Sequence, residues 1–151
     1  MEPNTRVGVL LQALDQYLEE IEERMPQDYT EYEDDLEKRR FIERTLQISI
    51  EACIDICHHL IKEKRLGFIT NEDNMFEKLA TAKIISKELR DKLKDMKGFR
   101  NVLVHRYVEL DDEKAYHHAT HDREDFDQFR REIRTYLTST KNASKKNKPK
   151  K

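Results

Sequence analysis

The segment from Gly98 to Tyr107 carries the side chains of this sequence that are best suited to catalysis. It places an arginine, an amide, an imidazole and a phenol close together, at Arg100, Asn101, His105 and Tyr107. Arg100 presents a planar fork of N–H donors that suits a phosphate, and the unperturbed pKa of histidine lets His105 exchange protons near neutral pH. Together these two side chains are suited to phosphodiester chemistry.

The spacing of these residues limits how they can cooperate. Asn101 and His105 are four residues apart, so on a helix they share a face and the amide can fix the tautomer of the imidazole. Arg100 and His105 are five residues apart, which is about 140° around an ideal helix. Two side chains that diverge by this angle do not converge well on one straight helix. The spacing therefore predicts a site completed by irregular backbone or by a second chain.

The pattern Arg100-x4-His105-x-Tyr107 resembles the R-x4-H-x-Y signature of HEPN-domain proteins, and the run from Arg100 to His105 closely resembles its form in HepT-like toxins. A second block agrees with the first. Residues 51–61 are similar to the long-helix segment of HepT-like proteins, and the spacing between the two blocks fits that family as well. The similarity covers roughly residues 5–137.

The resemblance implies a metal-independent endoribonuclease, without a cofactor, that is the toxin of a type VII-like toxin–antitoxin pair. In HEPN ribonucleases the motifs of two protomers meet at a homodimer interface, and the 2′-hydroxyl of RNA attacks the adjacent phosphate. On that pattern His105 is the general base or acid, Arg100 stabilises the negative charge of the transition state, and Asn101 positions one of them. The resemblance also implies a partner, an MntA-like minimal nucleotidyltransferase antitoxin, that silences the toxin by transferring AMP to Tyr107.

Two other interpretations remain open. Helical bundles of this kind also accompany nucleotidyltransferase domains as substrate-binding subunits, in which Arg100 and His105 would merely contact a nucleotide phosphate. In the other interpretation Arg100 pairs with a carboxylate, His105 is a satisfied interface histidine, and the protein is a dimeric adaptor without catalytic activity. Cleavage of RNA by the purified protein, lost in His105→Ala, would distinguish the ribonuclease from both.

Composition is consistent with a helical protein of one domain. The chain has 151 residues, 40% of them charged, and a mean hydropathy of −0.96. Only three glycines and three prolines interrupt the chain, and apolar residues recur at helical spacing. No apolar run approaches the roughly 18 residues of a membrane span, and the start does not look like a signal peptide. We therefore expect a cytoplasmic protein without a membrane segment.

Hydrophobic periodicity predicts an all-α, up-and-down bundle of four to five helices. The first helix should span about 5–25 and end before Pro26. Further helices are predicted over about 33–65, 74–82 and 86–96, with Gly98 interrupting or re-aiming the chain before the motif. A last helix, predicted over about 113–137, has an N-cap candidate in Asp111 or Asp112.

Charge is unevenly distributed, although the formal net charge is only −2. Residues from Ser139 onward include six lysines and no acid, which leaves 23 basic and 31 acidic residues in the preceding body. Bulk charge therefore does not make the body a nucleic-acid binder. Local cations would have to attract RNA, namely Lys97, Arg100 and Arg106. We expect a HEPN-like domain over residues 1–137 and a Lys-rich, disordered tail over residues 138–151.

Other titratable side chains lie on the predicted helices. On the long helix, Gln47, Glu51, Asp55 and His59 form one polar row, which is either a solvated face or, together with His58, a set of groups that orient Arg100 or His105. His117 and His121 share a helical face, but without a neighbouring carboxylate motif no metal site is predicted. Cys53 and Cys57 are expected to be reduced core residues.

Overall fold

The protein is all-α, as the sequence predicts. The computed structural model describes residues 5–105 and 111–146, and the side chains of residues 6–105 and 111–140. Over these residues there are six helices: α1 (Thr5–Arg24), α2 (Tyr29–Asp34), α3 (Leu36–Glu63), α4 (Glu72–Thr81), α5 (Lys87–His105) and α6 (Asp112–Lys146). The predicted number of four to five is wrong, because the short helix α2 precedes the long one.

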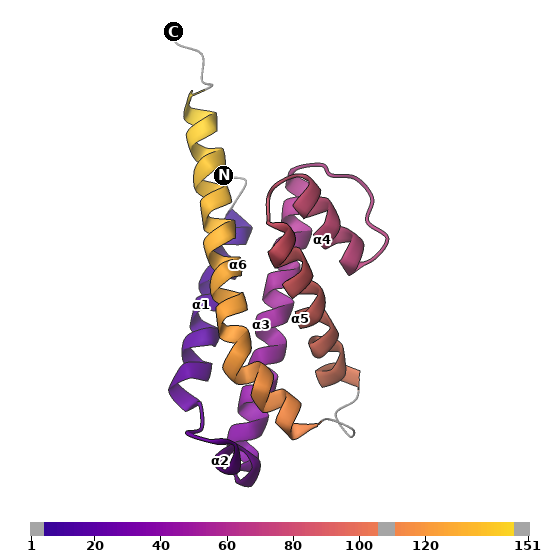
Figure 1. Cartoon of the computed structure of the whole chain (residues 1–151). Coiled ribbons are helices and arrows are strands. Elements are labelled where there is room, and N and C mark those ends of the chain that lie inside the picture. Colours follow the sequence, from indigo (N-terminus) through magenta and orange to yellow (C-terminus); the bar gives the residue numbers. More distant parts are fainter. Residues whose placement is uncertain (1–4, 106–110, 147–151) are drawn as a thin grey trace.

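Helix α3 is the centre of the molecule and contacts each of the other helices. In Figure 1 the helices α1, α3, α5 and α6 run alongside one another, with α2 at one end and α4 beside the other end of α3. The predicted apolar stripe of the long helix is confirmed as core, since its residues are all buried: Ile42, Leu46, Ser49, Cys53, Ile56, Cys57, Leu60 and Ile61. Cys53 and Cys57 are free thiols in this stripe, as expected.

Two aspartate caps set the start of the long helix. Asp28 Oδ1 accepts a hydrogen bond from Glu31 N at 2.9 Å and caps α2, while Asp35 Oδ1 accepts one from Lys38 N at 3.0 Å and caps α3. The chain at Asp35 is extended between the two helices. The continuous helix predicted from residue 33 therefore begins at Leu36 instead, because Asp35 satisfies the first free N–H groups of α3.

Helix α4 also begins earlier than predicted. Asn71, rather than a residue near Asn74, is its N-cap, and Asn71 Oδ1 accepts a hydrogen bond from Asn74 N at 2.7 Å. This cap brings Glu72 and Asp73 into the first turn, where carboxylates interact favourably with the helix dipole. The position of Glu72 is important for the candidate site.

Gly98 does not interrupt α5, contrary to the prediction. The helix is continuous from Lys87 to His105, and a Cβ added at Gly98 would meet no atom within 4 Å. Glycine weakens a helix interior by roughly 0.5–1 kcal/mol relative to alanine. Apolar packing on the other side of α5 outweighs this cost, through the buried residues Leu89, Leu93, Met96, Phe99 and Leu103.

Helix α6 begins at the predicted cap and ends later than predicted. Asp111 Oδ1 accepts hydrogen bonds from the backbone of Glu113 and Lys114, as an N-cap does. The end predicted near Leu137 is wrong, because α6 continues to Lys146 and no glycine or proline occurs between these two residues. The division into a body and a disordered tail at residue 138 stays a prediction.

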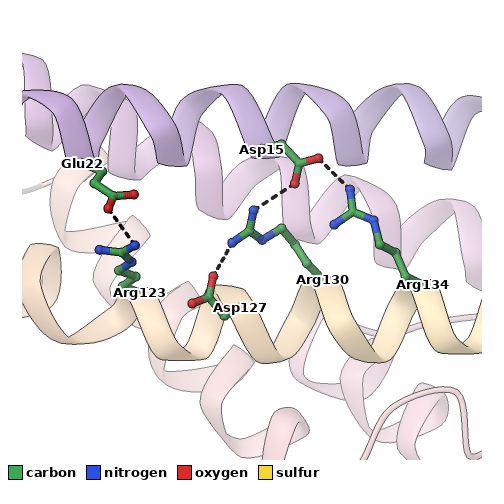
Figure 2. A network of polar contacts seen from close by, with 6 residues as sticks. All are labelled: Asp15, Glu22, Arg123, Asp127, Arg130 and Arg134. Atoms are coloured by element: carbon green, nitrogen blue, oxygen red, sulfur yellow. Dashed lines mark hydrogen bonds and ion pairs between the residues drawn. The ribbon is translucent and has the colours of Figure 1, made fainter.

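Ion pairs join α6 to α1 along one side of the bundle. Figure 2 shows Asp15 on α1 between Arg130 and Arg134 on α6, with oxygen–nitrogen distances of 2.9 and 2.6 Å. Arg130 also pairs with Asp127, and Glu22 with Arg123. The pairs between α6 and α1 hold these two helices together. None of the described helices is long and apolar enough to cross a membrane.

Candidate active site

Arg100 is held in place on two sides. Its Nη2 donates a hydrogen bond to Glu72 Oε1 of α4 at 2.5 Å, and its Nε donates one to Asn101 Oδ1 at 2.9 Å. The side chains of Arg100 and Glu72 are 16% and 28% exposed, so water only partly screens their ion pair. Charge-assisted hydrogen bonds of this kind are the stronger ones in proteins. The guanidinium of Arg100 therefore has a defined position before any ligand arrives.

The contact with Glu72 is one of three ion pairs between α4 and α5. Lys94 Nζ lies 2.8 Å from Glu77 Oε1, and Lys97 Nζ lies 2.8 Å from Asp73 Oδ1. The contact at Lys97 is an ion pair without the angles of an aligned hydrogen bond. Lys97, a predicted RNA contact, is thus partly neutralised by Asp73, and its contact with RNA stays a prediction.

His105 is the last residue of α5, and its side chain is exposed. Because α5 is an uninterrupted helix, the angle of about 140° between His105 and Arg100 applies. Within the described residues, no hydrogen bond or ion pair holds the imidazole of His105. Asn101 accepts its hydrogen bond from Arg100 rather than from His105. A single chain thus presents a fixed arginine and a separate, accessible histidine. Arg106 and Tyr107 lie outside the described residues.

The polar row of α3 is not brought to Arg100 by any described contact. Glu51 accepts a hydrogen bond from Gln47, Asp55 is exposed, and His58 and His59 line a cavity at the end of α3. A role for these side chains in orienting Arg100 or His105 stays a prediction.

The carboxylate that the structure places at Arg100 is Glu72, which the sequence pattern does not identify. Glu72 lies 28 residues before Arg100 in the chain, so no local spacing connects the two. The available signal is the cap residue Asn71 followed by two acids, which marks the start of a helix but not its partner. Burial and, to a smaller extent, the negative charge of Glu72 raise the pKa of the Cys57 thiol on α3.

Helix α6 supports the motif segment from its buried side. The ring of Phe99 stacks on the imidazole of His118, with ring centroids 3.9 Å apart, and Nδ1 of His118 lies 2.8 Å from Asp122 Oδ2. The imidazoles of His117 and His121 stack on each other, also at 3.9 Å. In residues 5–105 and 111–146 no three histidine, cysteine or carboxylate side chains gather as metal ligands.

Comparison with known proteins places this arrangement in a family. The family model described as ribonuclease HepT-like matches residues 14–133. The mRNA nuclease HepT of Shewanella oneidensis is 36% identical over 102 residues, which cover 68% of this chain and 77% of the relative. The tRNA nuclease HepT of Aphanizomenon flos-aquae is 25% identical over 127 residues, which cover 84% of this chain and 86% of the relative.

Solved structures agree with the sequence relatives. The tri-AMPylated HEPN toxin of Shewanella oneidensis, in complex with an MNT antitoxin, matches with a TM-score of 0.80 at 30% identity, over 87% of this chain and 98% of that one. The cytosolic protein YutE of Bacillus subtilis matches with a TM-score of 0.79 at 18% identity, over 91% and 92% of the two chains, which shows a shared fold alone. Since the family match extends over most of the described helices, the chain belongs to the HepT-like ribonuclease family.

Proposed function

We propose that this protein is the toxin of a type VII-like toxin–antitoxin pair, a metal-independent endoribonuclease that acts in the cytoplasm as a homodimer. The observation that carries the proposal is the fixed guanidinium of Arg100, which Glu72 and Asn101 hold in place. Arg100 and His105 lie on the same helix, α5. In a chain of the HepT-like family, these are the groups required when the 2′-hydroxyl of RNA attacks the adjacent phosphate.

The chemistry needs a proton acceptor, a proton donor and a cation. His105 takes the proton of the 2′-hydroxyl, the 2′-oxygen forms a bond to the adjacent phosphorus, and the bond from phosphorus to the 5′-oxygen breaks. Water protonates the departing 5′-oxygen, which leaves a 2′,3′-cyclic phosphate and a free 5′-hydroxyl, and the imidazolium of His105 returns its proton to that water. Each site thus needs one imidazole, from one protomer, and one guanidinium, from its partner. The bonds to phosphorus that form and break lie within the RNA, and only protons pass through His105 and water, so the reaction consumes no metal and no cofactor.

Arg100 retains the capacity to bind the phosphate while Glu72 holds it. A guanidinium has five N–H donors. Two are used, by Glu72 and Asn101, and the three others have no hydrogen-bond partner among the described residues, so they can face a phosphate that gains negative charge in the transition state. A fixed donor of this kind costs no reorganisation at the moment of reaction. Glu72 and Asn101 thus act through Arg100.

A second protomer brings the histidine and the arginine together. The five-residue offset on α5 turns Arg100 and His105 about 140° apart. A two-fold axis near the motif would place the His105 of one protomer beside the Arg100 of its partner, and closed two-fold dimers are the commonest homo-oligomers. The active site is then a cleft between two copies of α5.

The relatives indicate the substrate class and the partner. They are described as nucleases of mRNA and of tRNA, so RNA is the proposed substrate. A related HEPN toxin occurs AMPylated and bound to an MNT antitoxin. We propose that a nucleotidyltransferase of this class transfers AMP from ATP to the phenolic oxygen of Tyr107 and releases pyrophosphate. The added phosphate would compete with RNA for the cations of the motif.

The test is cleavage of a labelled RNA by the purified protein in EDTA. Wild type should produce 2′,3′-cyclic phosphate ends, and an RNA with 2′-deoxy sugars should resist cleavage. Arg100→Ala and His105→Ala should each lower the rate by about 10²–10⁴-fold, whereas His117→Ala, an exposed histidine of α6, should keep it. Loss of activity in EDTA, restored by a divalent metal, would contradict the metal-independent mechanism. Absence of cleavage by a protein that still binds its antitoxin would favour the non-catalytic subunit.

A further inference from the structure

The end of α3 and the loop after it form a surface that the candidate active site does not use. A cavity of about 550 Å³ lies there, lined by His58, His59, Ile61, Lys62, Arg65 and Gly67. Next to it in the chain, Phe68 is 83% exposed, more than any other large apolar residue of the described part. We call Lys62, Arg65 and Phe68 the α3-end surface.

The cations of this surface lack the carboxylate partners found elsewhere. On α5 and α6, in contrast, many basic side chains form ion pairs, among them Lys92, Lys94, Lys97, Arg100, Arg123, Arg130 and Arg134. In the part of the chain that the structure describes, no ion pair engages Lys62 or Arg65. Burial raises the pKa of their acidic neighbour Glu63, and the nearby His59 and Lys64 oppose this shift. The α3-end surface therefore presents positive charge on a protein whose body is acidic.

The backbone at Arg65 gives a second, independent reason to look for a ligand. Arg65 has a φ of 50°, in the left-handed region, and Leu66 N donates to Ile61 O at 3.1 Å to close the end of α3. Glycine is the usual residue at this position of a helix end, and a side chain there is strained. Strain of this kind is often found where the side chain has a function. Here it keeps a guanidinium at the cavity.

The loop that carries Phe68 is fixed to α4, the helix whose Glu72 contacts Arg100. Lys78 Nζ of α4 donates hydrogen bonds to Phe68 O at 2.6 Å and to Leu66 O at 3.2 Å. Four peptide steps of at most about 3.6 Å connect Phe68 to Glu72, so their Cα atoms lie within about 14 Å. An RNA strand with its scissile phosphate at Arg100 can therefore reach Phe68 within a few nucleotides.

We propose that the α3-end surface is a binding subsite for single-stranded RNA, in which Lys62 and Arg65 bind backbone phosphates and one base stacks on Phe68. The inference rests on the proposed ribonuclease function and extends it to substrate recognition. Proteins that bind single strands combine a basic groove with exposed aromatic rings, because every base has a face that stacks. Lys62 and Arg65, which line the cavity, supply the positive charge, and the anchored loop presents the ring without a large ordering cost.

The test measures binding and cleavage separately. Binding uses a decamer RNA with 2′-O-methyl sugars, which cannot be cleaved. Phe68→Ala should weaken binding about tenfold. Arg65→Gly should weaken binding and lower the salt slope of log K by about 0.7, the contribution of one phosphate contact in a single strand. The same Arg65→Gly should leave the melting temperature unchanged or higher, because glycine relieves the strained φ.

Two variants serve as matched controls. Lys83→Gly also removes a cation at a positive φ, of 63°, and Leu36→Ala also removes an exposed apolar side chain, but neither residue lines the cavity. Both should keep wild-type affinity for the decamer. Cleavage of unmodified RNA gives an independent readout, since the ratio between the cleavage rates of an unmodified decamer and of a dinucleotide should fall only in the α3-end variants.

Three results would overturn the subsite. The first is unchanged decamer affinity in Phe68→Ala and Arg65→Gly, and the second is an equal loss in Lys83→Gly. The third is loss of antitoxin binding with RNA binding intact, which would make this surface a protein interface. If wild type binds the decamer, the two variants weaken binding, and no RNA is cleaved, the subsite stands and the ribonuclease proposal fails.

Discussion

Glu72 and Arg100 connect the start of α4 to the motif on α5, with 2.5 Å between Oε1 and Nη2. Asn101 accepts a second hydrogen bond from the same guanidinium, at Nε. The direction of the motif arginine is thus set by one neighbour in sequence and by one residue of another helix. Glu72 is a positioning residue in this account, since it touches Arg100 rather than the proposed substrate.

Glu72→Gln should lower RNA cleavage about 10- to 100-fold, because a misplaced catalytic group commonly costs this much. The glutamine amide lacks the negative charge that fixes Arg100, but the phosphate-binding donors of Arg100 stay in place. The loss of activity should therefore fall mainly on kcat rather than on KM. Steady-state cleavage of a short RNA measures both. Glu77→Gln, which removes the ion pair with Lys94 on the same two helices, is the matched control and should keep kcat. An increase in activity on loss of Glu72 would show that Glu72 inhibits Arg100.

Gly98→Ala should stabilise the isolated fold and weaken the proposed dimer. Gly98 and His105 are seven residues apart and share a face of α5, offset by about 20°. A Cβ at Gly98 meets nothing within one chain, so alanine should raise the stability of the helix by roughly 0.5–1 kcal/mol. If the face that carries His105 packs against a second copy, the same methyl group should cost about 1–3 kcal/mol in dimerisation.

Sedimentation equilibrium and thermal unfolding measure these two effects. Gly8→Ala is the control, since Gly8 is also helical with open space around its Cβ position. At protein concentrations too low for dimerisation, both variants should unfold at a higher temperature than wild type. Only Gly98→Ala should shift the dimer equilibrium. Unchanged dimerisation in Gly98→Ala would place the interface on another face.

Asp15→Asn should weaken the attachment of α6 to α1 in a pH-dependent way. Burial tends to raise the pKa of Asp15, but hydrogen bonds from Arg134 and Arg130 outweigh this effect and lower the pKa below its ordinary value of 3.8. A carboxyl with a lowered pKa contributes stability above its ordinary pKa and loses it as pH falls through the pKa of the folded state. The pairs are partly exposed, so the variant should lose only about 1 kcal/mol near pH 7.

Urea unfolding at several pH values measures this difference. The gap in unfolding free energy between wild type and Asp15→Asn should be constant from pH 5 to 7, the range above the ordinary pKa of the carboxyl, and should shrink below about pH 4. Asp91→Asn is the control: its pKa is also lowered, but by the adjacent Arg90 on the same helix. A gap that stays constant down to pH 2, well below the ordinary pKa, would contradict the role of the Asp15 charge.

The sequence predicts the helices better than their ends. Apolar residues at steps of three and four identify α1, α3 and α6, because burial on one face of a helix requires this spacing. Caps decide where helices begin, and single polar residues such as Asp35 and Asn71 compete with several neighbours that are equally good caps. Gly98 misleads for a similar reason: its conformational freedom is local, whereas the packing of Phe99 and Leu103 that keeps α5 straight is tertiary.

The candidate site could be predicted only in part. Arg100, Asn101 and His105 are identifiable because the motif is local and its residue types suit phosphate chemistry. Glu72 is not, since its partner is 28 residues away and depends on how α4 packs on α5. The exposed Phe68 is likewise invisible in sequence, where an aromatic residue is expected to be buried.

Tyr107→Phe should escape silencing by the antitoxin. We expect wild type, incubated with the nucleotidyltransferase and ATP, to gain the mass of one or more AMP groups and to lose RNase activity. Without the phenolic oxygen, the first AMP has no attachment point at this residue, so the variant should keep its original mass and its activity. Intact-mass spectrometry and RNA cleavage on the same samples measure both. Full silencing of Tyr107→Phe with AMP attached elsewhere would show that another residue is the acceptor.

If Arg100 of one chain and His105 of the other cleave RNA together, a mixed dimer of two inactive variants should recover activity. Arg100→Ala and His105→Ala chains with different affinity tags are co-expressed, and the mixed dimer is purified through both tags. It retains one intact Arg100 and one intact His105 on opposite chains. We predict that the mixed dimer cleaves RNA at a measurable fraction of the wild-type rate, while each parent homodimer is inactive. A mixed dimer as inactive as its parents, with the dimer itself intact, would contradict a site shared between chains.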